Sequence, residues 1–468
     1  MHFLSAQPHR PSRFWIALAA LLMLTGLPRL ASAEALLLIE ADTGKVLQAE
    51  NATYPWYPAS VTKIMTAYVT LKAVKEGRLT LDSLITVSPV AAAQSPSKMG
   101  FAPGTQLTVD NALKMMMVKS ANDMAVVLAE GVGGSIDGFS EMMNATAQRL
   151  GMTQTHYVNP NGLPAEGQVT SARDLAILAR AVIRDLPEYE YFVHIPAIRF
   201  GKRVTYNFNK LIGRYPGADG FKTGFICASG YNLVASATRN GRRLIAVVLG
   251  ASSGQDRAVK AAQLLERGFS ANTLAWLTPS LGTVDNLAPI DATPPNLRDE
   301  MCGPKRKRPA SDEDEQVAGV IANGDTVLSM FSPPALRPVD MIAAAPAPTE
   351  PVQVYTGPTR TGAALLAAAA RDADNQAAAA KKKTAKKKGA KPKDDAKEAA
   401  AGEKNGRTSV TIDTTKPKPA GAKHANAKSD AAADKPAAAA KPKPKATTAA
   451  KPAPKSATGE TKPAKPGT

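Results

Sequence analysis

The chain has 468 residues and a formal net charge of +18, distributed unevenly along its length. Residues 371–468 contain 24 Lys or Arg against 10 Asp or Glu, a surplus of 14, and they contain no Phe, Tyr or Trp. Such a composition cannot bury enough apolar surface to offset its chain entropy, which predicts a disordered Lys/Ala/Pro-rich tail. The high net charge therefore belongs to the tail and does not imply a basic catalytic face.

The first 33 residues have the pattern of a secretory signal. Arg10 and Arg13 precede an apolar run at 14–24, and small residues end the segment at 31–33. The run is shorter than the roughly 20 residues of a membrane span, which favours a cleaved signal peptide. The alternative is an uncleaved membrane anchor. We therefore expect an exported protein of the periplasm or cell envelope, with a mature chain that starts near Glu34 and has no transmembrane helix.

Residues 34–271 show the strand and helix periods of an α/β domain. The apolar run at 36–39, the turn at 42–44 and a short strand from Val46 predict a hairpin at the start of a sheet. Helical patterns follow at 61–74, 109–117, 123–130 (closed by Gly131), 135–150 (closed by Gly151) and from Ser171, where Asp174 completes a capping box. The three methionines at 115–117 are expected to fill the core.

Beyond Pro196 the period changes to that of strands, at 198–206, 220–226, 231–238 and 244–249. The Asn240-Gly241 turn makes the last two an antiparallel hairpin. An amphipathic helix at 256–269 is expected to pack on that sheet. Residues 272–370 are rich in proline and in blocks of like charge, which predicts a mostly disordered linker with one small ordered patch at 317–331.

Three short motifs carry the candidate chemistry: Ser60-Val61-Thr62-Lys63, Ser120-Ala121-Asn122 and Lys222-Thr223-Gly224. Each alone is a weak signal, because its residues also have ordinary uses as a helix cap, a solvated lysine, a turn asparagine or a charge on a strand. Their occurrence together, each on the expected kind of element, favours an active-site-serine hydrolase.

Ser60 is the predicted nucleophile and Lys63 its general base. At the start of a helix, backbone N–H groups favour developing negative charge, and a residue at i+3 lies on the same face. Lys63 can accept the hydroxyl proton if burial and the charge of Lys222 lower its pKa. In the break between two helices, Ser120 can relay a proton to a leaving amine, and Asn122 can hold a substrate amide and bond Lys63.

The strand motif supplies the predicted substrate-binding residues. Lys222 offers a fixed positive charge to a substrate carboxylate, helped by the Thr223 hydroxyl. Gly224 lets the strand approach an extended peptide, which would add main-chain hydrogen bonds along the strand edge. The oxyanion hole is expected from the backbone N–H groups of Ser60 and Phe225.

The cysteines and histidines offer few further candidates for a functional site. Cys227 and Cys302 can form a disulfide in an exported protein, or can remain one buried and one mobile thiol. Of the five histidines, only His156 and His194 lie in the expected folded domain, and neither has the spacing of a metal ligand. We therefore expect no metal and no cofactor, and a Ser-His-Asp triad would have to use one of these two.

In its motifs the chain resembles the serine D-alanyl-D-alanine carboxypeptidases of peptidase family S11, low-molecular-weight penicillin-binding proteins, over roughly residues 35–270. Further stretches that look like this family are 57–60, 159–163, 170–174, 219–224 and 230–237. The resemblance implies a penicillin-binding protein/serine β-lactamase-like fold, an antiparallel sheet flanked by helices plus a helical subdomain. It also implies hydrolysis of the terminal D-Ala-D-Ala bond of peptidoglycan stem pentapeptides through acyl-Ser60, which trims cell-wall precursors and limits cross-linking. β-Lactams would acylate the same serine.

The chain departs from the family pattern in two places. Members with a second domain continue into a small β-rich domain and a C-terminal amphipathic membrane helix, whereas this sequence continues into the proline-rich segment. Many relatives have Thr two residues after the motif glycine, where this chain has Ile226 followed by Cys227. The second departure bears on how a substrate carboxylate is bound and how acyl-Ser60 is released.

Two other functions compete with the carboxypeptidase. A class A β-lactamase needs a loop glutamate, and the nearest candidate, Glu166, lies in a stretch that does not resemble that loop. A non-catalytic cell-wall-binding protein that acts through its tail is disfavoured by the complete motif set. The tail is expected to associate electrostatically with anionic membrane or cell-wall surfaces and not with nucleic acid, because export separates it from DNA.

Overall fold

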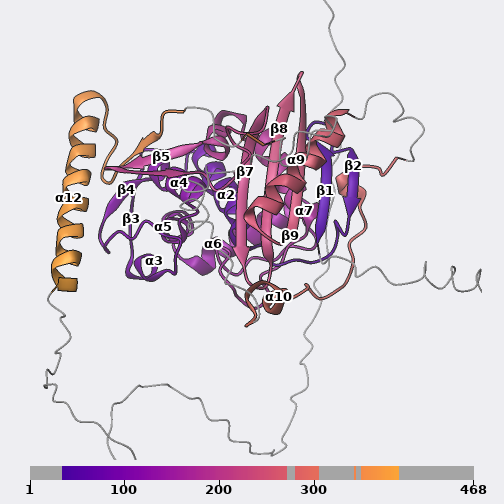
Figure 1. The fold of residues 1–468 in the computed structure, drawn as a ribbon, viewed down its shortest axis with the longest axis horizontal. Helices are drawn as coiled ribbons and strands as arrows, with labels where there is room; N and C mark the ends of the chain where they lie inside the picture. The colour runs from indigo at the N-terminus through magenta and orange to yellow at the C-terminus, as the bar shows by residue number, and fades with distance from the viewer. Residues whose placement is uncertain (1–33, 271–279, 305–341, 344–348, 389–468) are drawn as a thin grey trace, which may run out of the picture. The chain divides into compact units, whose positions relative to one another are not determined.

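The computed structural model describes residues 34–270, 280–304, 342–343 and 349–388 (Figure 1). The expected signal at 1–33, the expected patch at 317–331 and the part of the expected tail after 388 lie outside the described residues.

A five-stranded antiparallel sheet forms the centre of the fold, in the order β2-β1-β9-β8-β7. Its strands are β1 (Ala35–Glu40), β2 (Val46–Glu50), β7 (Ala218–Ile226), β8 (Gly230–Arg239) and β9 (Arg242–Ala251). Asn240 and Gly241 have φ values of 49° and 74°, which suit a type I′ turn at the expected Asn-Gly position between β8 and β9. The predicted hairpins and antiparallel sheet are confirmed, and β7 is left as an edge strand.

Helices cover both faces of this sheet, α7 (Ala172–Asp185) on one and α9 (Gly254–Ser270) on the other. Strand side chains alternate between faces. Leu37 and Ile39 of β1 therefore join the core that contains the α7 side chains, whereas Leu38 joins the core that contains those of α9. The sheet thus separates two apolar layers, as expected for a fold of this class.

A helical part adjoins the sheet and is built around α2 (Lys63–Lys75), which follows a 3₁₀ turn at Ala59–Thr62. Its other elements are β3 (Leu84–Thr86), α3 (Pro89–Ala93), β4 (Gln106–Thr108), α4 (Val109–Lys119), α5 (Asn122–Gly133) and α6 (Ile136–Arg149). Residues 122–129 of α5 are all buried, so this helix lies in the interior. Met115, Met116 and Met117 are at most 1% exposed, which confirms them as core residues.

Two element boundaries differ from the sequence-based expectation. The single strand expected over 198–206 is a hairpin of β5 (Ala197–Phe200) and β6 (Arg203–Tyr206), because Gly201, at φ 57°, allows a tight turn there. The helix α5 passes through Gly131 and ends at Gly134, which adopts φ 74°. A 3₁₀ turn at Pro187–Tyr189 and the short α8 (Tyr191–His194) connect α7 to β5.

The segment expected to be linker also contains ordered elements that pack on residues 34–270. They are a 3₁₀ turn at Val284–Asn286, α10 (Arg298–Cys302), β10 (Val352–Val354), which pairs parallel to β5, and α12 (Gly362–Lys388). The expected boundaries at 272 and 371 therefore do not separate folded from unfolded chain. Scattered apolar residues such as Val284 and Val354, both fully buried, anchor these elements.

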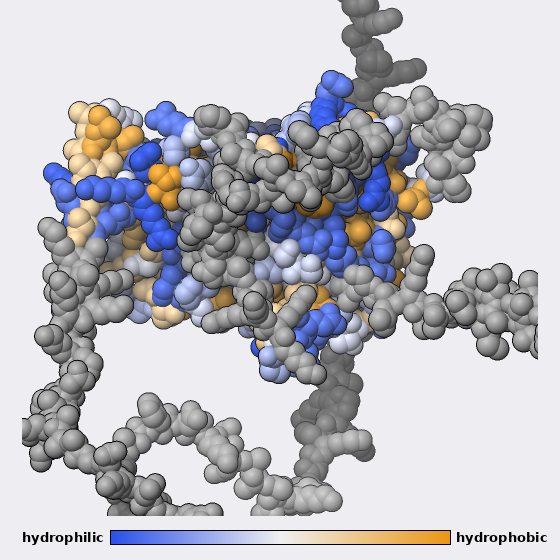
Figure 2. Space-filling view, in the orientation of Figure 1, coloured by the Kyte–Doolittle hydropathy of each residue, from blue (hydrophilic) through white to orange (hydrophobic). Residues whose placement is uncertain are grey.

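The helix α12 begins with an Ala- and Leu-rich stretch and continues into a lysine-rich one. Gln376 donates a hydrogen bond to the Phe200 carbonyl at 3.0 Å, and Ala373 is buried, so the helix is fixed against β5. Leu366 is 72% exposed, and Figure 2 shows the apolar start of α12 at the left edge of this face. In the described part of the chain, no helix combines the length and apolarity that crossing a bilayer requires.

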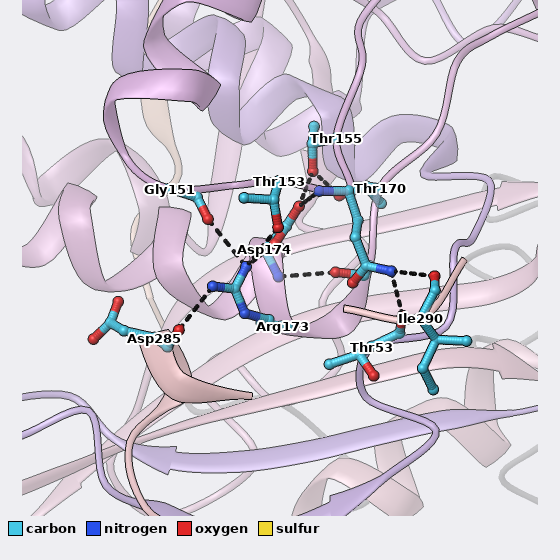
Figure 3. Close-up of polar contacts among 11 residues, drawn as sticks. Thr53, Gly151, Thr153, Thr155, Thr170, Arg173, Asp174, Asp285 and Ile290 are labelled. Atoms are coloured by element: carbon cyan, nitrogen blue, oxygen red, sulfur yellow. Dashed lines mark hydrogen bonds and ion pairs between the residues drawn. The ribbon is translucent and has the colours of Figure 1, made fainter. Parts of the chain in front are cut away.

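A polar network fastens the segment after α9 to α7 and to the turn after α6 (Figure 3). Arg173 lies 2.7 Å from the carboxylate of Asp174 and donates to the Asp285 carbonyl at 3.0 Å. Gln154 donates to the Ile290 carbonyl at 2.8 Å. Burial raises the pKa of Asp174, and its hydrogen bonds and the neighbouring guanidinium oppose that effect. The main-chain carbonyls of Asp285 and Ile290 are therefore held by side chains of α7 and of the turn after α6.

Candidate active site

Ser60 and Lys63 lie where the chain passes from the 3₁₀ turn into α2. Ser60 is partly exposed, whereas Lys63, the first residue of α2, is fully buried. The i+3 spacing places the Lys63 Nζ 2.9 Å from the Ser60 Oγ. A hydroxyl that faces a cleft is thus backed by an amine that water does not reach.

The Lys63 amine has three oxygen partners. They are the Ser60 Oγ, the Asn122 Oδ1 at 2.7 Å and the Asn161 carbonyl at 2.6 Å. Burial, and then the charge of Lys222, hold the pKa of Lys63 well below its ordinary value, with Asp123 opposing them. A neutral amine has two hydrogens and one lone pair. Two hydrogens can satisfy Asn122 and Asn161, which leaves the lone pair for the serine proton.

Ser120 and Asn122 lie in the break between α4 and α5, as predicted. Ser120 ends α4 in the left-handed conformation, with φ 60°, which costs energy for a residue with a Cβ. Asn122 begins α5, and its side-chain amide donates to the Ser95 carbonyl at 2.9 Å. The break therefore turns one hydroxyl and one amide toward Lys63 and β7.

Lys222 reaches from the edge strand β7 toward this break. Its Nζ donates to the Ser120 Oγ at 2.9 Å and to the Thr223 carbonyl at 3.0 Å, and its side chain is 1% exposed. The Thr223 Oγ1 is buried and has no hydrogen-bond partner in the described part of the chain. Such a group is uncommon in folded proteins and often has a functional reason.

Gly224 explains how closely β7 approaches the serine. A Cβ at this position would lie 2.7 Å from the Ser60 backbone nitrogen, 3.0 Å from that of Val61 and 3.1 Å from the Pro58 carbonyl. Only glycine permits this contact between strand and 3₁₀ turn. The Ser60 amide thus lies beside the strand segment that continues into Phe225.

A cavity of about 220 Å³ opens onto these groups. It is lined by Ser60, Pro96, Ser97, Ser120, Asn122, Gly162, Leu163, Phe208, Phe225 and Ile226. The buried Lys63 and Lys222 contact two of these lining residues, Ser60 and Ser120. The predicted site residues therefore converge on one cleft between the sheet and the helical part.

Comparison with known proteins agrees with this arrangement. Residues 25–253 match the pattern of the Peptidase S11 family, described as D-alanyl-D-alanine carboxypeptidase. The D-alanyl-D-alanine carboxypeptidase DacB2 of Mycobacterium tuberculosis is 34% identical over 253 residues, which cover 52% of this chain and 84% of that protein. The chain belongs to this family. The expected family and fold class are thereby confirmed.

Two other relatives define the extent of the match. DacC of Escherichia coli K12 is 39% identical over 254 residues, 51% of this chain but only 61% of DacC. The crystal structure of DacD from Francisella tularensis is 32% identical, with a TM-score of 0.50, over 52% of this chain and 71% of that one. The likeness to the carboxypeptidases is thus confined to about half of this chain and about three fifths of DacC.

Two groups at this S11 site were not assigned a role from the sequence. The Asn161 carbonyl bonds Lys63, and only its place in the family-like stretch 159–163 pointed to it. Arg257 of α9 is 1% exposed, and its guanidinium lies 3.4 Å from the Gly224 carbonyl and 3.5 Å from the Phe208 carbonyl. A charged residue on a helix surface is ordinarily solvated, so sequence gave no signal of its burial.

The other sequence candidates lie around the site and not in it. Cys227 and Cys302 form a disulfide, which settles the alternative left open by the sequence. The Ser60 Oγ contacts the Lys63 Nζ, whereas His156 Nδ1 lies 3.1 Å from the Gly167 carbonyl. His156 therefore does not take the place of the histidine in a Ser-His-Asp triad. Within the described ranges, no three His, Cys, Asp or Glu side chains are grouped as metal ligands would be.

Proposed function

We propose that this chain is an active-site-serine D-alanyl-D-alanine carboxypeptidase that hydrolyses the terminal D-Ala-D-Ala bond of peptidoglycan stem pentapeptides. The observation that carries the proposal is the 2.9 Å contact between the Ser60 Oγ and the fully buried Lys63 Nζ. A serine becomes nucleophilic only beside a base, and the lowered pKa of Lys63 makes its amine available as one.

In the acylation step, the Ser60 Oγ attacks the carbonyl carbon of the penultimate D-alanine while its proton passes to the Lys63 Nζ. The tetrahedral oxyanion accepts hydrogen bonds from the backbone N–H groups of Ser60 and Phe225. The C–N bond then breaks, and the proton returns from Lys63 through the Ser120 hydroxyl to the leaving amine of D-alanine. Ser120 lines the same cavity as Ser60, and its Oγ accepts a hydrogen bond from Lys222, so its own O–H can donate in this relay.

In the deacylation step, water adds to the acyl-Ser60 carbonyl and gives its proton to Lys63. The ester C–O bond breaks, and the Ser60 oxygen takes up the proton that Lys63 accepted from the water, which returns Lys63 to its neutral form. Trimming of the pentapeptide to a tetrapeptide removes the donor bond for cross-linking, so this activity would limit cross-links in the wall.

Lys222 and Thr223 are proposed to bind the terminal carboxylate of the substrate. The buried Thr223 Oγ1, unpartnered in the described part of the chain, supports this role, because a carboxylate oxygen would satisfy it. β7 is an edge strand, so an extended peptide can pair with its free side beside Gly224. Asn122 is proposed to hold the scissile amide. β-Lactams are proposed to acylate Ser60 as covalent inhibitors.

The competing functions have less support. Glu166 lines a neighbouring cavity and is not among the residues that line the cleft at Ser60, so it is poorly placed to activate a deacylating water as in a class A β-lactamase. We expect slow penicillin hydrolysis with a long-lived acyl-enzyme. A purely wall-binding protein would have no need for a buried lysine with three polar contacts.

Mass spectrometry tests this proposal directly. The full chain should release one D-alanine from a stem pentapeptide, and the Ser60→Ala variant should release none above the uncatalysed rate. Release by Ser60→Ala at the wild-type rate, or no release by the wild type, would refute the proposal.

Residues 1–33 are proposed to direct export to the periplasm or cell envelope, because their composition is that of a cleaved secretory signal. The basic tail is proposed to hold the enzyme near anionic membrane or wall surfaces, where each lysine contributes at most about 1 kcal/mol.

A further inference from the structure

One side of the catalytic cleft is formed by residues 95–100, here called the wall segment, which lie between α3 and β4. Pro96 and Ser97 of this segment line the cavity at Ser60. The wall segment is neither helix nor strand, so its backbone groups must find partners on other elements. Its position beside the nucleophile therefore depends on the elements that supply those partners.

Asp123, in the first turn of α5, supplies two of these partners. The Met99 N–H donates to the Asp123 Oδ1 at 3.1 Å, and the Gly100 N–H donates to the Asp123 Oδ2 at 2.8 Å. The Asp123 side chain is fully buried. Hydrogen bonds to an ionised acceptor are stronger than those between neutral groups. One carboxylate thus fastens the end of the wall segment to α5.

The other end of the wall segment is fastened to the same break between α4 and α5. The Asn122 N–H donates to the Ser97 carbonyl at 2.8 Å. Lys119, at the end of α4, donates from its Nζ to the Ser97 Oγ at 3.0 Å, and this hydroxyl donates to the Lys119 carbonyl at 2.9 Å. The cation of Lys119 is therefore directed at the wall segment, and the segment and the break form one unit.

The charge of Asp123 also acts on the buried amines of the site. Lys63 and Lys222 are at most 1% exposed, and two buried cations without a neighbouring anion are costly. Burial, and then Lys222 of β7, lower the pKa of Lys63, whereas the Asp123 carboxylate of α5 opposes both effects. Asn122 and the loop that carries Asn161 contribute uncharged oxygens to the Lys63 amine.

These two effects of Asp123 bear on one step. A general base must be neutral to accept the serine proton, and a more basic amine accepts it more readily. We propose that Asp123 is a positioning residue of the active site, whose carboxylate fixes the wall segment beside Ser60 and whose negative charge supports Lys63 as the general base. The inference rests on the proposed carboxypeptidase chemistry and adds a residue that acts through Lys63 and the wall segment.

The pH dependence of penicillin acylation tests the role of the charge. The second-order rate constant for labelling of the full chain should fall at low pH, where Lys63 is protonated. Asp123→Asn removes the charge and keeps the size, so this acid limb should move to lower pH. Asp123→Glu keeps the charge and should leave the acid limb close to its wild-type position. Asp137→Asn, at an exposed acid in the first turn of α6, is the matched control and should keep the wild-type profile.

The rate above the acid limb tests the role of the hydrogen bonds. In Asp123→Glu the added methylene displaces the carboxylate from the Met99 and Gly100 N–H groups, so labelling on the plateau should be at least about tenfold slower than in the wild type. Hydrogen exchange of the wild type tests the same contacts without a substitution. The amides of Met99 and Gly100 should exchange much more slowly than those of an unprotected chain.

Three results would overturn the proposal. They are an acid limb of Asp123→Asn that stays in place or moves to higher pH, a plateau of Asp123→Glu equal to that of the wild type, and unprotected amides at Met99 and Gly100 in the wild type. If a variant does not fold, hydrogen exchange of the wild type still decides. A wild type that penicillin does not label would refute the carboxypeptidase function itself, which distinguishes that failure from failure of the role of Asp123.

Discussion

Lys63 is the residue on which the proposed chemistry depends. Its burial disfavours the ammonium form, so the folded chain gives up this proton at a lower pH than the unfolded chain. Between the lowered pKa and the ordinary value of 10.5, the unfolded state binds the extra proton, and the contribution of Lys63 to folding stability therefore rises with pH.

Replacement of Lys63 tests this pH dependence. The free energy of unfolding of Lys63→Met, relative to wild type, should fall as the pH rises from about 7 to about 10, because the wild type is relieved of its buried charge over that window. Urea denaturation at several pH values measures it. Lys114→Met, at a partly buried lysine of α4 that pairs with Asp110 outside the site, is the matched control. A relative stability that stays constant or rises with pH would contradict the lowered pKa.

Gly224 gives a second prediction at the scale of one residue. In Gly224→Ala the added methyl group would collide with the Ser60 and Val61 backbone nitrogens, which cannot move as a flexible side chain can. We expect a loss of about 1–3 kcal/mol in the free energy of unfolding and slower acylation by penicillin, by at least about tenfold. Denaturation and time-resolved penicillin labelling measure both, and labelling at the wild-type rate would argue against the close approach.

At the scale of elements, the disulfide connects the end of β7 to α10. Cys227 follows the last residue of β7, and Cys302 ends α10, 75 residues later. A cross-link that closes a loop of this size restricts the unfolded chain and typically contributes about 2–4 kcal/mol.

The disulfide therefore predicts a redox-dependent stability. Cys302→Ser should lower the thermal midpoint, and a reductant should lower that of the wild type to a similar value. The reductant should leave the midpoint of Cys302→Ser unchanged, because this variant has no disulfide to reduce. The variant thus controls for other effects of the reductant. A wild-type midpoint that does not respond to complete reduction would show that the cross-link contributes nothing.

At the scale of the whole molecule, much of the fold of residues 34–270 follows from the sequence because its signals are local. The apolar run at 36–39, the Asn240-Gly241 turn and the spacing of Ser60 and Lys63 each depend on a few neighbouring residues. Arg257 and the Asn161 carbonyl were missed because their roles depend on contacts across the fold. The elements α10 and β10 were missed because single buried residues such as Met301 and Val354 do not form a periodic pattern.

The charge distribution of the whole chain leads to a prediction about the tail. Because α12 extends to Lys388 and packs on β5, a truncation that tests the tail should fall after this residue. The truncated chain should bind vesicles of anionic lipid more weakly at low salt, with D-alanine release unchanged. Cosedimentation with neutral vesicles is the control, and equal binding of both chains to anionic vesicles would count against tethering by the tail.

The central claim is that Ser60 forms the covalent intermediate. Intact-mass analysis after incubation with penicillin, followed by proteolysis and peptide mapping, tests it most directly. We predict the addition of one penicillin per chain, located on the peptide that contains Ser60, and no addition to Ser60→Ala. An adduct on any other residue, or an adduct on Ser60→Ala, would contradict the account.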